Sequence, residues 1–213
     1  MGNSEHVAKV RLLGEATRRM IPSSKDSRDM FLIGILSGPP DLGEKLRRTW
    51  VDLSRSLKAD GQIDLSGEDL SSLAFWGSIP LFSGANLNGT NFANSFFFQF
   101  DFEQADLKDA CFDQCVFPVP VCFRGSCLEK ATFKRVVNFV PFLEKTNLRN
   151  ACFDGVIFRG GPYIDDGTDL TNASFVGCEC KLYSDGSGGD GIKKFLSFLS
   201  REQKKQIMVT RSS

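Results

Sequence analysis

The chain has 213 residues and carries 26 basic and 26 acidic side chains, so its formal net charge is zero. It contains no apolar run of about 18 residues and no signal peptide at its start, which argues against a membrane-spanning helix and against secretion by that route. We therefore expect a protein of the bacterial cytosol or, if it is a delivered effector, of a host cytosol. Its length suits one repeat domain with appendages.

Residues 1–62 are predicted to form a helical N-terminal region. A first helix over residues 5–20 has an apolar stripe made of Val7, Val10, Leu13, Ala16 and Met20. A second helix is expected over residues 26–36. A third, with Asp41 as its N-cap, has the stripe Leu42, Leu46, Trp50, Leu53 and Leu57. This region is either a cap over an open end of the repeats that follow, or a separate interaction or delivery segment that includes at least residues 1–25.

Residues 63–182 repeat every five residues. Examples are Ala85-Asn86-Leu87-Asn88-Gly89 and Ala105-Asp106-Leu107-Lys108-Asp109. Each unit has a small residue, a residue that is usually polar, Leu or Phe, and two mostly polar residues. A period of five fits neither a helix nor a flat strand, so it indicates a repeat architecture.

The large residue of every fourth unit forms a column. The first column is Leu65, Leu87, Leu107, Leu128, Leu148 and Leu170, and the second is Leu70, Phe92, Phe112, Phe133, Phe153 and Phe175. The third is Phe75, Phe97, Phe117, Asn138 and Phe158, with a possible further member at residue 180, and the fourth is Phe82, Phe102, Phe123, Leu143 and Tyr163. A super-period of about 20 residues predicts a coil with four sides, and its columns point inward because burial removes them from water.

These units resemble the A(D/N)LXX motif of the pentapeptide-repeat family. The match is carried by Ala85-Asn86-Leu87, Ala105-Asp106-Leu107, Thr146-Asn147-Leu148 and Thr168-Asp169-Leu170. The resemblance implies an all-β fold, a right-handed quadrilateral β-helix. Four positions depart from the motif: Pro80, Phe100, Asn138 and Pro141. We expect the coil at residues 136–142 to be locally irregular.

Residues 183–213 are predicted to form a glycine-rich linker and a short helical cap. The linker spans residues 183–191, and an amphipathic helix follows with Ile192, Phe195, Leu196 and Leu199. A capping box from Ser200 to Gln203 starts another helix that we expect to run through Met208. This region either caps the end of the column or serves as a helix for homodimerisation or partner binding.

The sequence offers little for catalysis or for metal binding. The seven cysteines all lie in the repeats, there is no CxxC pair, and His6 is the only histidine. We interpret the cysteines as reduced, packable residues, because Cys111 and Cys152 lie two coils apart, too far for a disulfide. A phosphate-binding loop and a supported catalytic triad are both missing. We expect no enzyme activity, no cofactor, no metal and no small-molecule substrate.

Charge along the repeats is arranged in three bands. Residues 64–113 hold eight acidic side chains and one basic, residues 114–159 seven basic and three acidic, and residues 160–185 five acidic and one basic. We therefore predict a partner-binding surface in the basic band, together with the protruding loop at residues 160–167. Its residues are Lys130, Lys134, Arg135, Lys145, Arg149, Tyr163, Asp165 and Asp166.

The favoured function is a non-enzymatic protein-interaction module with a regulatory or effector role. The alternative comes from the resemblance: some pentapeptide-repeat proteins mimic duplex DNA, bind DNA gyrase and protect it from quinolones or toxins. Such mimicry needs a continuous acidic surface, which the basic band interrupts. Direct nucleic-acid binding is not expected, because the basic band is short and most aromatic residues face inward. We also expect no membrane binding.

Overall fold

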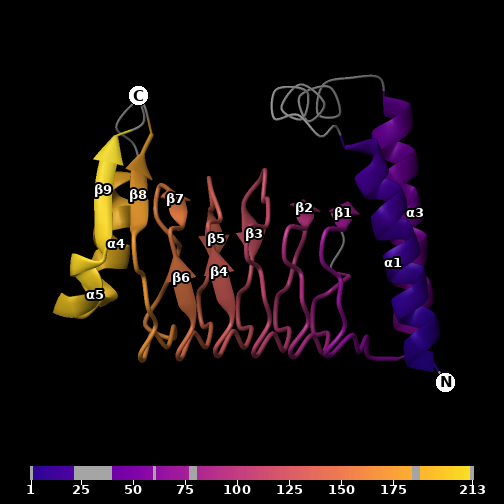
Figure 1. The fold of residues 1–213 in the computed structure, drawn as a ribbon, viewed down its shortest axis with the longest axis horizontal. Coiled ribbons are helices and arrows are strands. Elements are labelled where there is room, and N and C mark those ends of the chain that lie inside the picture. The colour runs from indigo at the N-terminus through magenta and orange to yellow at the C-terminus, as the bar shows by residue number, and fades with distance from the viewer. Residues whose placement is uncertain (1, 22–39, 60, 77–80, 184–187, 212–213) are drawn as a thin grey trace.

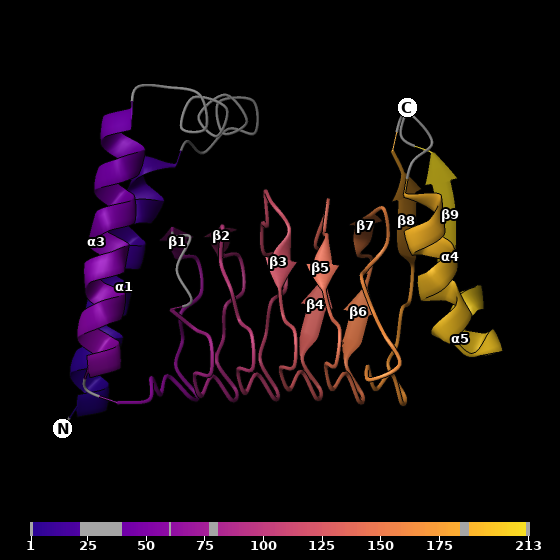
Figure 2. The same cartoon turned by 180° about the vertical axis from the view of Figure 1, so that it is seen from behind.

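The computed structural model describes residues 2–21, 40–59, 61–76, 81–183 and 188–211. Stacked coils of the repeat form a column along the long axis of the molecule (Figure 1). Helices α1 (Gly2–Met20) and α3 (Pro40–Ala59) lie beside the first coil. Helices α4 (Gly189–Phe198) and α5 (Arg201–Lys205) and strand β9 (Ile207–Arg211) lie at the other end (Figures 1 and 2). The predicted helix at residues 26–36 falls outside the described residues.

Each coil pairs in parallel with the next coil. Along the first column, one-residue bridges join Asp64, Asn86, Asp106, Cys127, Asn147 and Asp169 in succession. Strands β1 (Ala74–Trp76) and β2 (Phe96–Phe98) pair on the third column, where β7 (Ile157–Arg159), β8 (Cys178–Leu182) and β9 also form a sheet. On the second column β4 (Thr132–Lys134) pairs with β6 (Cys152–Asp154), and on the fourth β3 (Val121–Cys122) pairs with β5 (Pro141–Phe142). This connectivity is that of a parallel β-helix.

The polar residue before each inward residue shapes the turn. Asp106 Oδ1 accepts the backbone N–H of Lys108 at 3.1 Å, and Asn147 Oδ1 accepts that of Arg149 at 3.1 Å. The corner then needs a left-handed backbone, as at Asp109, where φ is 56°. Asn, Asp and Gly tolerate this conformation best, which explains their frequency at the ends of units.

Large apolar side chains fill the interior. Leu87, Leu107, Leu128 and Leu148 of the first column are fully buried, whereas Leu170 is only partly buried. The rings of the second column stack nearly parallel, with centroid separations of 5.2, 5.0, 5.0 and 5.1 Å between Phe92, Phe112, Phe133, Phe153 and Phe175. Offset stacks of this kind add to the free energy of burial.

Two predicted inward positions are wrong by one residue. Asn138 is exposed and adopts a φ of 56°, while Phe139 is buried between Phe117 and Phe158, at 5.0 and 6.0 Å. Tyr163 is 45% exposed, and Ile164 takes the inward place instead. The physical reason at Asn138 is that an amide in an apolar core would lose its hydrogen bonds to water, whereas Phe139 gains from burial.

Helices α1 and α3 pack against the first coil. The buried face of α1 comprises Val7, Val10, Gly14 and Thr17; the predicted stripe is wrong at Ala16 and Met20, which are exposed. A Cβ at Gly14 would lie 3.1 Å from the Leu73 side chain, so glycine permits the close approach. Trp50 of α3 is buried with its ring 5.8 Å from Phe75, and its Nε1–H donates to Thr17 Oγ1 at 3.2 Å. Leu57 is also buried and Leu53 partly so, whereas the side chains of Leu42 and Leu46 lie outside the described part.

Helix α4 packs on the last coil. Its Phe195 is buried with its ring 5.4 Å from Phe175 and 5.9 Å from Phe158. The capping box is present: Ser200 Oγ accepts from the N–H of Gln203, and the Gln203 side chain accepts from the N–H of Ser200. The prediction that this helix continues through Met208 is wrong, because α5 ends at Lys205 and β9 pairs with β8 from Cys178↔Ile207 to Leu182↔Arg211.

Candidate protein-binding surface

The structure pairs charges of opposite sign on neighbouring coils. Lys134 Nζ lies 3.7 Å from Asp113 Oδ2, and the Lys134 N–H donates to Asp113 Oδ1 at 3.0 Å. The Arg149 guanidinium lies 3.5 Å from Asp169 Oδ2. Two further pairs follow the same pattern, Arg124–Glu144 at 3.1 Å and Lys108–Glu129 at 3.7 Å. Three basic residues of the band, Arg124, Lys134 and Arg149, are therefore neutralised within the molecule.

The other predicted basic residues are separated from one another. Lys130, Arg135 and Lys145 adopt φ values of 59, 56 and 57°, which places each of them at a corner. Lys130 follows the first column, Arg135 the second and Lys145 the fourth. In the described part of the chain, no ion pair involves these three side chains. The structure does not bring the predicted basic residues together into one site.

The predicted loop lies on the fourth column. The Tyr163 ring stacks on Phe142 with centroids 4.8 Å apart. Asp165 Oδ1 accepts the backbone N–H groups of Lys145 at 2.8 Å and Gly167 at 3.1 Å. The bond from the Lys145 backbone, above all, lowers the pKa of the Asp165 carboxyl. Asp165 therefore shapes a turn, whereas Asp166 is exposed beside it.

Five outward positions of the third column are apolar, which the sequence analysis missed. They are Ala74, Phe96, Val116, Val137 and Ile157, and the charged Glu179 follows in register with Ile157. At the matching positions of the first column stand Asp64, Asn86, Asp106, Cys127, Asn147 and Asp169. Val116 bridges to both Phe96 and Val137, so the apolar residues form a continuous stripe. In the sequence this stripe is visible as an apolar residue at the second position of the unit that contributes to the third column, which is every fourth unit.

Exposure of this stripe is greatest at its middle. Phe96 is buried, Val116 and Ile157 are partly exposed, and Val137 is 47% exposed. Arg135 stands at the adjoining corner, and the Arg159 guanidinium lies 5.1 Å from the Tyr183 ring centroid. We call Val116, Arg135, Val137, Ile157 and Arg159 the third-column surface. Arg beside exposed apolar side chains is typical of protein interfaces.

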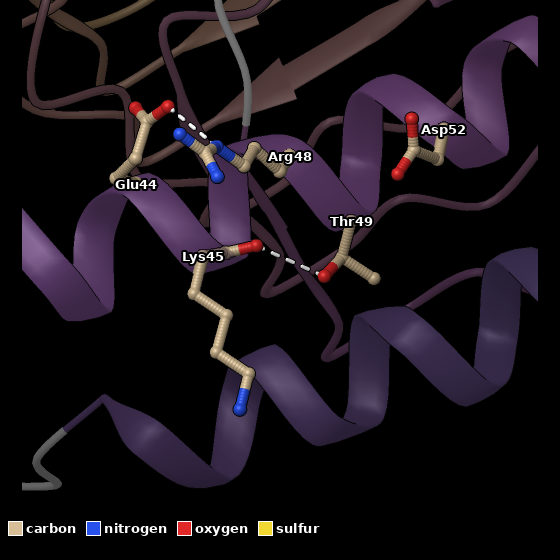
Figure 3. A pocket seen from close by; sticks show the side chains of 5 residues that line it. All are labelled: Glu44, Lys45, Arg48, Thr49 and Asp52. Carbon is tan, nitrogen blue, oxygen red and sulfur yellow. Dashed lines mark hydrogen bonds and ion pairs between the residues drawn. The ribbon is translucent and has the colours of Figure 1, made fainter.

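A polar depression on α3 shows no comparable feature. It is lined by Glu44, Lys45, Arg48, Thr49 and Asp52 (Figure 3). Glu44 pairs with Arg48 at 2.9 Å, and Thr49 Oγ1 donates to the Lys45 carbonyl at 2.9 Å. Both contacts are local to the helix, between residues four apart, so this surface is a solvated helix face.

The thiol groups have the properties of packing residues. All seven cysteines are free. Burial raises the pKa of Cys178 and that of Cys180 to about 12, and it also raises the pKa of Cys115. These three thiols are thus protonated and unreactive at neutral pH. No group of three or more potential metal ligands is found among the described residues. In the same part of the chain, every helix is too short or too polar to cross a membrane.

Comparison with known proteins identifies the repeat. The family model for pentapeptide repeats matches residues 81–117 with 8 copies. None of the curated proteins matches the chain.

Three solved structures are similar to parts of the chain. HetL, a pentapeptide repeat protein involved in heterocyst differentiation regulation from the cyanobacterium Nostoc sp. strain PCC 7120, is 15% identical with a TM-score of 0.38, over 59% of this chain and 63% of HetL. A pentapeptide repeat protein from the cyanobacterium Cyanothece 51142 is 19% identical with a TM-score of 0.16, over 55% of this chain and 60% of that one. QnrB1, a plasmid-mediated fluoroquinolone resistance protein, is 17% identical with a TM-score of 0.22, over 71% and 91%. The chain thus spans less than two thirds of the first two proteins.

The five-residue register extends beyond the matched segment in both directions. It begins at the bridge between Asp64 and Asn86 and reaches the pair between Phe158 and Cys180. The repeat and its parallel pairing agree with the family match: residues 81–117 match the pentapeptide-repeat family model, and the same register continues on both sides of them.

Proposed function

We propose that this protein is a non-enzymatic interaction module that binds a protein partner through the third-column surface. The β-helix, a right-handed quadrilateral column capped at its start by α1 and α3, is the rigid support. The protein acts as a regulator or effector in a cytosol. In this proposal Arg135 stays in the predicted binding site, while Lys134 and Arg149 join coils to one another.

The observation that carries this proposal is the exposure of Val137 within an apolar stripe. Val137 is 47% exposed, and its bridge partner Val116 is partly exposed. Single exposed apolar side chains are common, but a continuous apolar stripe bordered by polar residues is typical of an interaction site. The outward positions of the first column show that the repeat itself does not require apolar residues there.

The surface favours a protein partner over nucleic acid. Nucleic-acid binding needs a row of cations free to contact phosphates. Here Lys108, Arg124, Lys134 and Arg149 are paired with carboxylates of adjacent coils. Of the basic residues without an ion pair in the described part of the chain, Arg135 directly precedes Val136 and Val137 in the sequence. An Arg beside an exposed valine suits a partner with an apolar patch and a carboxylate at its edge.

The test compares two exposed valines on different columns. Val137→Glu places a charge in the third-column surface, and Val176→Glu is the control, because Val176 is 51% exposed and lies on the second column. Tagged full-length chains are used to capture partners from a cell lysate, with proteins identified by mass spectrometry. We expect one partner to be lost with Val137→Glu and retained with Val176→Glu, with equal melting temperatures. Retention of every partner by Val137→Glu would refute the proposed surface.

The gyrase-modulator alternative has one observation in its favour. Asp101, Asp106 and Asp109 lie within one coil, and no ion pair within the described ranges involves them. Over the following coils, however, the acidic surface gives way to the paired charges. Inhibition of DNA supercoiling by purified gyrase discriminates between the two functions. A loss of supercoiling that Asp106→Asn reverses, and Val137→Glu does not, would favour the alternative.

A further inference from the structure

The backbone groups beneath the third-column surface are already paired between coils. The N–H of Val116 donates to the Ser95 carbonyl at 2.9 Å, and the Val116 carbonyl accepts from the N–H of Phe97 at 2.9 Å. Two coils further on, the N–H of Ile157 donates to the Val136 carbonyl at 2.8 Å. Strand addition needs a free edge, so a partner does not bind this face by extending the sheet. It has to dock on the outward side chains.

The exposed apolar side chains follow the long axis of the column. Val116, Val137 and Ile157 occupy equivalent outward positions of three successive coils, which are stacked along that axis (Figure 1). Neighbouring coils are separated by about 4.8 Å, so the three side chains span about 9.6 Å. The exposed stripe ends at Phe96, which is buried, and at Glu179, which is charged and in register with Ile157.

This spacing fits a helix better than an extended chain. In an α-helix, residues at i, i+4 and i+7 share one face and span about 10.5 Å. In an extended strand, alternate residues share one face, and three of them span about 13 Å. The helix therefore departs from the stripe by about 1 Å, and the strand by about 4 Å. A helix also satisfies its own backbone hydrogen bonds, whereas a single strand that lies flat on a sheet face leaves its own unsatisfied.

Two arginines flank the stripe on opposite sides. Arg135 stands at the corner two residues before Val137, and Arg159 follows Ile157 by two residues on the other side. Both are exposed, and no ion pair in the described part of the chain involves either of them. The Arg159 guanidinium is held over the Tyr183 ring, 5.1 Å from its centroid. This arrangement is complementary to an apolar face that carries carboxylates on both sides.

We propose that the third-column surface binds an amphipathic helix of a partner protein, which lies along the column and has acidic residues on both sides of its apolar face. This inference rests on the proposed function, because it assigns a class of partner to the same surface. The apolar side chains at i, i+4 and i+7 of the helix lie over Val116, Val137 and Ile157. In a heptad these are positions a and d, and glutamates at positions e and g lie on opposite sides of them, where they meet Arg135 and Arg159.

The first test uses a synthetic peptide of about three heptads, labelled with fluorescein, with Leu at positions a and d and Glu at e and g. Its binding to the full-length chain is measured by fluorescence anisotropy. We expect saturable binding that a proline at a central position of the peptide's polar face abolishes, because proline breaks the helix but leaves the apolar and acidic side chains in place. Equal binding of the proline peptide, or no binding of the helical peptide, would overturn the proposal.

The second test locates the peptide on the surface. Val116→Thr and Ile157→Thr each remove one methyl group from an end of the stripe, and each should weaken binding about fourfold. Arg135→Gln should weaken binding by up to about fivefold. Lys130→Gln is the matched control, because it removes the same charge from a corner of the first column, and it should bind like the wild type. Equal effects of Arg135→Gln and Lys130→Gln would show that only overall charge matters and would overturn the assigned site.

These results also separate the helical partner from the proposed function. If Val137→Glu removes a captured partner but the helical peptide fails to bind, the surface is still a binding site and the helical class of partner is wrong. If the peptide binds the wild type and not Val137→Glu, while Val137→Glu retains every captured partner, the helix site stands and the proposed function fails. Light scattering tests the other occupant. A wild-type mass of twice 23.6 kDa that Val137→Glu halves would place a second copy on this surface and overturn the helical partner.

Discussion

Removal of one ring from the second column should cost the protein a measurable part of its stability. Phe133 is fully buried, with Phe112 and Phe153 each at 5.0 Å and inclined by only 7° and 6°. Phe133→Leu keeps an apolar side chain and removes both stacks, which contribute about 0.5–1.5 kcal/mol each beyond burial, so we expect a loss of about 1–3 kcal/mol. Phe133→Ala also leaves a cavity and should cost about 3–5 kcal/mol.

The assay is urea unfolding followed by far-ultraviolet circular dichroism. Natural domains are stable by only about 5–15 kcal/mol, so both losses should appear as lower midpoints. Val137→Ala is the control, because exposed positions usually change stability by less than about 0.5 kcal/mol. If Phe133→Ala lowers stability by less than about 1 kcal/mol, the side chain is not part of a packed column, and the register proposed for the repeat is refuted.

Three further predictions concern the surface, the first coil and low pH. Lys134→Glu should destabilise the protein by about 0.2–1 kcal/mol, since it faces Asp113. Asp113→Lys in the same chain should restore the melting temperature only in part, because the backbone N–H of residue 134 then loses its acceptor, Asp113 Oδ1. Trp50→Ala should cost about 3–5 kcal/mol, because Trp50 fills the space over Phe75; an unchanged melting curve would contradict the cap. Hydrogen bonds from the backbone lower the pKa of Asp64 and Asp165 from the ordinary value of 3.8, so their stabilisation is present above that pH and lost as pH falls through the folded pKa. Melting temperature should therefore drop below about pH 4, and the drop should shrink in a variant with Asn at both positions, because Asn147 accepts the same type of bond.

The inward columns could be predicted because the period of the repeat allows only one way to stack the inward residues. A unit of five with a super-period of four units places Leu107 and Leu128, or Phe112 and Phe133, above each other without further information. The slip at Asn138 could not be found by counting. Phe139 lies six residues after Phe133, and Leu143 only four after Phe139, so the two deviations cancel within one coil. The side chains determine the register there, because Asn tolerates the left-handed backbone of a corner, whereas Phe is favoured in the buried position.

The last strand shows a different limit. The capping box correctly indicated where α5 begins, because that signal is local. The end of α5 depends on β8, which lies far away in sequence and offers an edge in register with Ile207. Residues 207–211 carry high β-propensity, but a short apolar run reads equally well as a helix segment. Tertiary pairing decided between the two.

The predicted basic residues lie apart for a reason that is itself structural. Summing charge along the chain groups residues that are neighbours in sequence, but a residue in a β-helix meets those one coil away. Asp113 and Lys134 belong to different bands, and so do Arg149 and Asp169, yet each pair is in contact. At Lys134 and Arg149, charges that lie in separate bands of the sequence are therefore paired in space. Aligning the sequence by columns instead places Val116 and Val137 next to each other, although they are far apart in the sequence. For a solenoid, a surface is a column of outward residues, and the third column departs from the polar pattern that the first column shows. On that argument the third column, and not the basic band, is where a partner should be sought.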